Sequence, residues 1–334
     1  IPELGHYKGI TIRHLLNHTS GLPDYMSLLR KKWDKTKVAT NTDIVKVFQT
    51  YKPNVLFPPG DKFRYSNTGY ALLANVVEKA SGTTYRNFLR KHIFKPLKMK
   101  HTFVHNRQPS PRSISSLAIG STLSDTSDKK ILVDISKSAS RFYYLGGIVG
   151  DGSIHSTVVD LLKWDRGLYK KKLVSSDSIK EIYSPSRTND GKTNQYGFGW
   201  RIRSDPGYGR ILNHSGSWAG FRTFIERHIE TGKTIIILQN FSQAVLPIRN
   251  IREILYDQPI PKIFRREIKI KRELLAEYAG DYVTKSDPKS IISISKGESY
   301  IIYNATEQKW NMKFYPETET SFFSKNQRFR INGF

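Results

Sequence analysis

The stretch FRYSNTGYALLANVVEKASG, from Phe63 to Gly82, decides the fold of this chain. It starts as a short strand-like segment, passes through a polar turn and continues as an amphipathic helix, which Asn67 or Thr68 is placed to cap and Gly82 to end. The apolar face of the helix repeats at helical spacing through Tyr70, Leu73, Val77 and Ala80. A strand end that feeds a helix N-terminus is a rigid place to present side chains. Tyr65 and Asn67 are therefore candidate catalytic residues, and the plain alternative is that they only pack and cap.

Helical and strand patterns alternate on both sides of this turn. Apolar residues at helical spacing predict helices over 11–18, from 41, over 84–92, from 156 and over 248–256. Strand-like patterns cover 196–202, 210–214, 221–226 and 234–239, whereas the polar interval 106–141 is expected to be a long loop. Short alternating runs over 275–334 predict a separate, mostly β module. We therefore expect one domain over 1–257, a linker over 258–274 and a β-rich domain over 275–334.

Composition restricts the partners of the protein. The net charge of +25 over 334 residues favours an acidic polymer or membrane face as a partner, and the alternative is a general bias toward Lys, Ile, Asn and Tyr. No zinc-finger, RNP or basic-zipper pattern accompanies the charge, so we expect no nucleic-acid partner. The absence of cysteine excludes disulfides and a thiolate nucleophile. No apolar run approaches the roughly 20 residues of a membrane-spanning helix.

Two further stretches carry residues that could do chemistry. Asn213 to Phe221, NHSGSWAGF, reads as strand, glycine-rich segment and strand, which could bind a substrate backbone along a strand edge or could be an ordinary turn. His14 to Pro23, HLLNHTSGLP, has histidines four residues apart. Neither this pair nor His101 and His105 has an intervening glutamate or an obvious third ligand, so these histidines are interpreted as structural and no metal or other cofactor is expected.

The order of these motifs carries a family resemblance. HLLNHTSGLP from His14, YSNTGY from Tyr65, STVVDL from Ser156 and HSGS from His214 follow one another over roughly residues 1–257. As a set they resemble the serine β-lactamase-related proteins, which include class C β-lactamases, D-alanyl-D-alanine carboxypeptidases, D-aminopeptidases and related esterases. The resemblance implies an α/β (α+β) fold, β-lactamase/transpeptidase-like, with an antiparallel sheet flanked by helices. The C-terminal β module is similar to the lipocalin-like domains appended to some members.

The resemblance also implies a mechanism and a set of site residues. A serine of a Ser-x-x-Lys motif attacks a carbonyl and forms an acyl-enzyme. Tyr65 then matches the tyrosine that acts as general base and acid with the motif lysine, and Asn67 matches the residue that holds the substrate amide and that lysine. His214, Ser215 and Gly216 match the third motif, often Lys-Thr-Gly. The backbone N–H of Ser217 would form half of an oxyanion hole.

His214 is the first departure from the family pattern. It stands where a lysine is usual, and a histidine can be neutral at pH 7, so a substrate carboxylate would lose a fixed positive partner. This shifts the expected substrate from carboxylate-ended, penicillin-like molecules toward esters, amides or D-amino-acid peptides.

The nucleophile is the second departure. Ser-x-x-Lys occurs at Ser127–Lys130, Ser286–Lys289 and Ser293–Lys296, but all follow Tyr65, whereas the family places the motif before it at the start of a buried helix. The first lies in a polar loop, the second contains a proline and the third lies in a predicted hairpin, so we reject them. The chain starts at Ile1 without methionine, and we expect the nucleophile upstream of it.

The sequence therefore predicts a serine hydrolase that cleaves an amide or ester, with a D-amino-acid peptide, β-lactam or ester as substrate. Residues 1–334 are expected to be inactive without the missing serine. The alternative is a catalytically dead protein that binds an acidic cell-envelope polymer through the same cleft. For either reading we expect a periplasmic, secreted or envelope-attached protein.

Overall fold

In the computed structural model, the helix predicted after Tyr65 is α4 (Asn67–Ser81). Ser66 caps it, because its hydroxyl accepts a hydrogen bond from the Gly69 N–H at 3.2 Å. The prediction that Asn67 or Thr68 caps the helix was therefore wrong by one residue. Gly82, with φ of +66°, ends α4 in the left-handed conformation that glycine tolerates best. The segment before the turn is extended but pairs with no described strand, so the predicted strand at Phe63 is absent there.

The structure describes residues 1–105, 117–124, 129–133, 142–243, 245–260, 266–284, 287–305, 310–324 and 330–332. Their contacts divide the chain into two compact units, Ile1–Ser242 and Gln243–Phe334. The first unit holds the candidate site residues. No described helix of either unit is long and apolar enough to cross a membrane.

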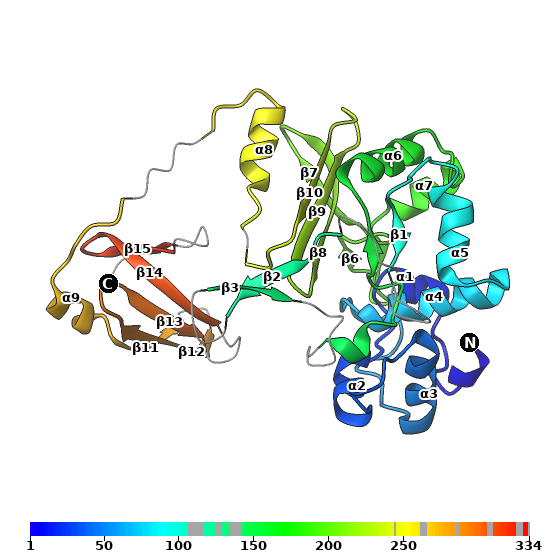
Figure 1. The fold of residues 1–334 in the computed structure, drawn as a ribbon, viewed down its shortest axis with the longest axis horizontal. Coiled ribbons are helices and arrows are strands. Elements are labelled where there is room, and N and C mark those ends of the chain that lie inside the picture. The colour runs from blue at the N-terminus through cyan, green and yellow to red at the C-terminus, as the bar shows by residue number, and fades with distance from the viewer. Residues whose placement is uncertain are drawn as a thin grey trace. The chain divides into compact units, whose positions relative to one another are not determined.

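Helices dominate the first part of the first unit (Figure 1). Thr11 caps the helix that starts at Ile12 by accepting from the His14 N–H, and Thr40 stands at the N-cap of the helix that starts at Asn41, where its N–H and hydroxyl donate to Asp43. The helical elements of the unit are η1 (Pro2–Leu4), α1 (Ile12–Leu16), α2 (Tyr25–Lys32), α3 (Asn41–Tyr51), α4, α5 (Tyr85–Leu89), the π-helical turn η2 (Arg90–Phe94), η3 (Tyr143–Leu145), α6 (Val158–Tyr169) and α7 (Ser176–Ile182).

A four-stranded antiparallel sheet follows the helices, in the order β10-β9-β8-β7. Its strands are β7 (Arg201–Asp205), β8 (Gly209–Trp218), β9 (Phe221–His228) and β10 (Thr234–Gln239). The α-helices of the unit gather on one side of this sheet (Figure 1). The predicted antiparallel sheet with flanking helices is confirmed.

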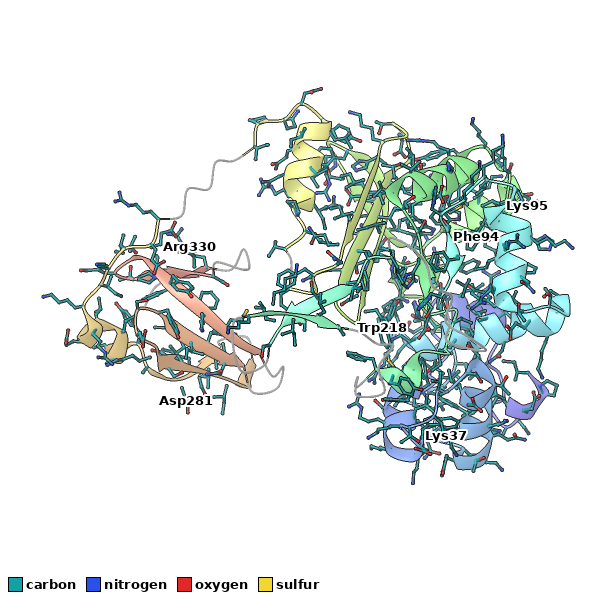
Figure 2. The ribbon with its side chains drawn as sticks, in the orientation of Figure 1. Lys37, Phe94, Lys95, Trp218, Asp281 and Arg330 are labelled. Carbon is teal, nitrogen blue, oxygen red and sulfur yellow. The ribbon has the colours of Figure 1, made fainter. Side chains whose placement is uncertain are left out.

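Apolar side chains of α6 and α7 hold them to the sheet. Leu168 of α6 packs with Trp200, Ile202 and Leu212 in one buried cluster. The fully buried Arg227 of β9 adds an ion pair with Asp165 of α6, with 2.5 Å between Nε and Oδ1. The same inside–outside division occurs earlier in the chain, where Phe94 is buried and the neighbouring Lys95 is exposed to solvent (Figure 2). Burial of one face thus fixes each element while the charged residues stay hydrated.

The interval predicted as a long loop contains a hairpin. Its strands are β2 (Gly120–Leu123) and β3 (Lys130–Val133), and parts of 106–141 lie outside the described residues. The Ser121 N–H donates to the Gly220 carbonyl at 3.1 Å. Backbone pairing with β3 and this long-range backbone contact, and not an alternating apolar pattern, therefore stabilise β2. Short pairs β1 (Phe103–Val104) with β4 (Ile154–His155) and β5 (Ser186–Arg187) with β6 (Thr193–Asn194) complete the unit.

The second unit is built around a six-stranded antiparallel sheet, in the order β11-β12-β13-β14-β15-β16. Ile294, Ile301, Phe314 and Phe322 form its core with Leu275 and Tyr278. The predicted β-rich C-terminal part is confirmed. The elements of the unit are α8 (Ile248–Leu255), α9 (Arg272–Glu277), β11 (Gly280–Thr284), β12 (Asp287–Lys296), β13 (Ile301–Ala305), β14 (Trp310–Thr318), β15 (Ser321–Phe323) and β16 (Arg330–Asn332).

Candidate active site

Thr68 anchors the turn that carries Tyr65 and Asn67. The Thr68 hydroxyl donates to the Pro23 carbonyl at 2.7 Å and accepts from the Tyr25 N–H at 2.9 Å. Tyr65 remains 45% exposed, and Asn67 is half-buried at the first position of α4. The turn is therefore fixed to the loop after α1 while its tyrosine faces solvent.

His18 fastens the same turn from a second side. It adopts a left-handed backbone with φ of +61°, and its side chain is 1% exposed. Its Nδ1 accepts from the Ser66 N–H at 3.1 Å, and its carbonyl accepts from the Arg64 N–H at 2.9 Å. Burial is the main cause that lowers the pKa of His18 to about 3, and the nearby His214 and Arg201 side chains add to this effect. His18 is therefore a neutral, buried histidine, as its structural interpretation predicted.

Strand β8 carries the other group of candidate site residues, which are His214, Ser215, Gly216 and Ser217. Strand β7 pairs with β8 only as far as Asn213, so among the described strands residues 214–218 pair with β9 alone. Ser215 and Ser217 are exposed on this stretch. A Cβ on Gly216 would lie 2.4 Å from the Thr223 hydroxyl, so glycine here admits a cross-strand side chain. The result is a short strand edge with accessible backbone groups.

The turn before α4 and strand β8 approach each other at Tyr65. Its ring centroid lies 5.9 Å from that of His214 and 4.1 Å from that of His18. The tyrosine of the Tyr-x-Asn turn and the histidine of the His-Ser-Gly segment, which are distant in sequence, are thus brought together. This juxtaposition is the geometric centre of the candidate site.

Tyr196 also belongs to the site, although the sequence analysis treated it only as part of a strand. It is 2% exposed, and its Oη lies 3.0 Å from His18 Nε2 and 2.9 Å from His214 Nε2. Burial raises the pKa of Tyr196, so its hydroxyl keeps its proton. The sequence offered no signal for this role, because Tyr196 stands in no motif and its partner His18 lies 178 residues away.

Arg201 is a second residue that the sequence analysis did not single out. It lies opposite Asn213 in the β7–β8 ladder. After the effect of burial, its positive charge contributes to lowering the pKa of His18 and of His214. It also acts on the pKa of Tyr65, which burial and the charge of Asp151 raise and Arg201 lowers. The site therefore has a fixed positive charge, although His214 itself is neutral.

The protonation state of Tyr65 limits what it can do alone. Because the pKa of this phenol is raised, it is protonated at neutral pH and needs an additional cation to act as a base. Asp151 carries a carboxyl whose pKa burial raises to about 6, and the Tyr25 hydroxyl donates to it at 2.7 Å. The arrangement suits proton transfer once a positively charged partner stands beside Tyr65.

None of the rejected Ser-x-x-Lys matches lies among the described residues of this site. Ser127 and Ser286 lie outside the described part of the chain. Ser293 and Lys296 lie on β12 of the second unit, where the Ser293 hydroxyl donates to Asp281 at 2.6 Å. Within the described ranges, no group of three or more His, Asp or Glu residues could hold a metal ion.

Most of the chain is similar to known proteins. The family model described as Beta-lactamase matches residues 2–256. The chain is 37% identical over 327 residues to Penicillin-binding protein 4* of Bacillus subtilis, covering 95% of this chain and 71% of that protein. It spans only about half the length of other curated relatives that it matches.

Solved structures give the same fold. The octameric penicillin-binding protein homologue from Pyrococcus abyssi superposes with a TM-score of 0.62 at 21% identity, over 98% of this chain and 77% of that one. D-amino acid amidase from Ochrobactrum anthropi SV3 superposes with a TM-score of 0.51 at 26% identity, over 69% and 64%. The first unit thus has the mixed α/β fold of β-lactamases and transpeptidases, followed by an antiparallel C-terminal sheet. The chain belongs to the β-lactamase family.

Proposed function

We propose that the first unit forms the site of a serine hydrolase that cleaves an amide or ester through an acyl-enzyme. The observation that carries this proposal is the approach of the Tyr65 and His214 rings to 5.9 Å. It brings the tyrosine of the Tyr-x-Asn turn beside the residue at which the open edge of β8 begins. Membership of the β-lactamase family supports the same reaction class.

The turn before α4 and the edge of β8 have separate roles in this proposal. Tyr65 transfers the proton between the nucleophile and the leaving group, and Asn67 holds the substrate amide. The edge of β8 from Ser215 to Ser217 binds the substrate backbone as an added strand, with the Ser217 N–H stabilising the oxyanion. The substrate class is a D-amino-acid peptide, a β-lactam or an ester.

The nucleophile is tested by mass spectrometry. Residues 1–334 are incubated with a β-lactam and, separately, with an activated ester, and the protein is then weighed. We expect no stoichiometric adduct, because no Ser-x-x-Lys match lies at the described site. If the reading frame upstream of Ile1 encodes such a motif, the extended protein should gain one acyl group on that serine. A stoichiometric adduct on any residue of 1–334 would contradict the prediction that these residues lack the nucleophile.

Tyr65→Phe tests the proposed proton transfer in an acylation-competent protein. Loss of the hydroxyl should lower the acylation rate by about 10²–10⁴-fold, the usual contribution of general acid–base catalysis. Tyr51→Phe is the matched control, because Tyr51 is 46% exposed at the end of α3 and Tyr65 is 45% exposed. Equal rates for the two variants, measured by stopped-flow acylation, would exclude a proton-transfer role for Tyr65.

A second candidate function rests on the net charge of +25. A protein of this family without turnover could hold an acidic envelope polymer at the same site, outside the cytoplasm. Co-sedimentation with cell-wall polymer that weakens as salt rises, together with no hydrolysis by the extended protein, would favour this function. Hydrolysis with salt-independent sedimentation would favour the enzyme.

A further inference from the structure

A chain of hydrogen bonds runs from the turn before α4 to the open edge of β8. It joins the Ser66 N–H to His18 Nδ1 (3.1 Å), His18 Nε2 to Tyr196 Oη (3.0 Å), and Tyr196 Oη to His214 Nε2 (2.9 Å). His214 Nδ1 then lies 2.7 Å from the Ser215 carbonyl oxygen. His18 and Tyr196 are both buried. Each of their ring nitrogens and hydroxyls in this chain is used within the protein.

The first end of the chain fixes the tautomer of His18. A backbone N–H can only donate, so His18 Nδ1 must accept from Ser66 and carries no proton. His18 is neutral because burial lowers its pKa to about 3, so its single proton is on Nε2. His18 Nε2–H therefore donates to the Tyr196 oxygen.

The other end fixes the tautomer of His214. A carbonyl can only accept, so His214 Nδ1 carries a proton and donates to Ser215. Burial lowers the pKa of His214, so the ring is neutral at pH 7 and its Nε2 has a free lone pair. That lone pair accepts from the Tyr196 hydroxyl, which at the same time accepts from His18. Every bond in the chain then points in the same direction.

This chain of hydrogen bonds ends at a stretch of β8 that has a neighbouring described strand on one side only. Residues 214–218 pair with β9 but with no other described strand. The Ser215 carbonyl and the Gly216 N–H share one rigid peptide plane. A hydrogen bond to that carbonyl therefore limits rotation of the backbone directly before the Ser217 N–H.

We propose that His18 and Tyr196 are positioning residues, which act through His214 to hold the Ser215–Ser217 edge in the geometry that binds substrate. The proposal rests on the proposed function of this edge. Both ring nitrogens of His214 have partners inside the protein, so His214 orients the backbone instead of exchanging a proton with substrate. The chain of hydrogen bonds thus links the Tyr-x-Asn turn to the strand edge that carries the Ser217 N–H.

Nuclear magnetic resonance of residues 1–334 tests the chain without any activity. Long-range ¹H–¹⁵N spectra at pH 7 should show His18 with its proton on Nε2 and His214 with its proton on Nδ1, both neutral. His18→Gln and His214→Gln assign the signals. A proton on His214 Nε2, or a charged His18, would overturn the proposal. This measurement requires no variant of Tyr196 to fold.

Tyr196→Phe keeps the ring and removes the central hydroxyl. The groups that face His214 are His18, Tyr65, Tyr196 and Arg201, and only the Tyr196 hydroxyl is lost. Because that hydroxyl donates to neutral His214, its loss should raise the titration midpoint of His214 by about 0.5–1 pH unit. Amide hydrogen exchange at Gly216 and Ser217 should speed up about fivefold to tenfold.

Tyr7→Phe is the matched control, because it also removes a buried-side hydrogen-bonded hydroxyl, which donates to the Pro53 carbonyl at 2.8 Å. It should leave His214 and the exchange of both amides unchanged. If Tyr196→Phe also leaves them unchanged, the positioning role is wrong even if the protein is a hydrolase. If the tautomers and the exchange behave as expected but the extended protein is not acylated, the positioning role is supported and the proposed function is wrong.

Discussion

At the scale of single residues, one arginine changes the substrate expected for this site. The replacement of lysine by His214 predicted that a substrate carboxylate would find no fixed positive partner. Arg201 lies across the ladder from Asn213, and its charge affects the pKa of His18, Tyr65 and His214. A guanidinium is always charged and matches carboxylate geometry. Carboxylate-ended peptides therefore return to the set of candidate substrates.

Arg201→Gln tests this in an acylation-competent protein. For a D-amino-acid peptide with a free carboxylate, kcat/KM should fall about 10–100-fold, because a charge-assisted hydrogen bond is lost. For the same peptide as its amide, kcat/KM should change little. Arg203→Gln is the control, since Arg203 lies two residues along β7 and pairs with Asp205 at 3.5 Å. Equal losses for both peptides would show that Arg201 does not read the carboxylate.

These residues also show where sequence reasoning ended. Tyr65 and His214 stand in local motifs, so their positions could be predicted, and the structure brings their rings together. Tyr196 and Arg201 stand in no motif. Tyr196 meets His18 across 178 residues of sequence, a contact that exists only after the sheet has packed on the helices. A single sequence does not encode such a pair in any local pattern.

At the scale of elements, the β8–β9 turn determines where β2 docks. Ala219 and Gly220 both have positive φ, +35° and +89°, which is the geometry of a tight hairpin loop. A Cβ on Gly220 would lie 2.4 Å from the Ser121 nitrogen and 2.5 Å from the Gly120 carbonyl carbon. Glycine here serves both the turn and the close approach of β2. The hairpin was not predicted because its stabilising partner lies about a hundred residues away, not in its own alternation.

Gly220→Ala should destabilise the first unit by about 2–4 kcal/mol, through backbone strain and overlap with β2. Urea unfolding followed by tryptophan fluorescence measures this loss. Gly207→Ala is the matched control in the neighbouring β7–β8 turn, where a Cβ would meet only Asp205 Oδ1 at an ordinary 3.7 Å. Equal stability of the two variants would mean that β2 does not depend on this contact.

At the scale of the whole molecule, burial of titratable groups opposes its charge. The chain carries +25 at neutral pH, and each histidine that stays neutral in the folded state avoids adding to that charge. His18 and His155 have pKa values lowered to about 3 and about 4, mainly by burial. Asp151 acts in the opposite direction, because burial raises its pKa to about 6.

The pH dependence of stability follows from these shifts. Between pH 6 and pH 4.5 the unfolded chain binds protons on both histidines that the folded chain does not, whereas the folded chain binds one on Asp151. Unfolding therefore takes up at least one net proton, and stability should fall by about 1.4 kcal/mol per pH unit as the pH decreases. Urea unfolding at several pH values measures the slope.

Two variants should move that slope in opposite directions. His155→Phe keeps the ring contacts with Phe103 and Phe221 but removes one titrating group, so the fall in stability should become shallower. Asp151→Asn keeps an acceptor for the Tyr25 hydroxyl and removes the opposing group, so the fall should become steeper. Stability that stays level or rises from pH 6 to 4.5 would show that the unfolded chain takes up no net proton. The buried histidines would then not hold the neutral state on which the hydrogen-bond chain from His18 to Ser215 depends.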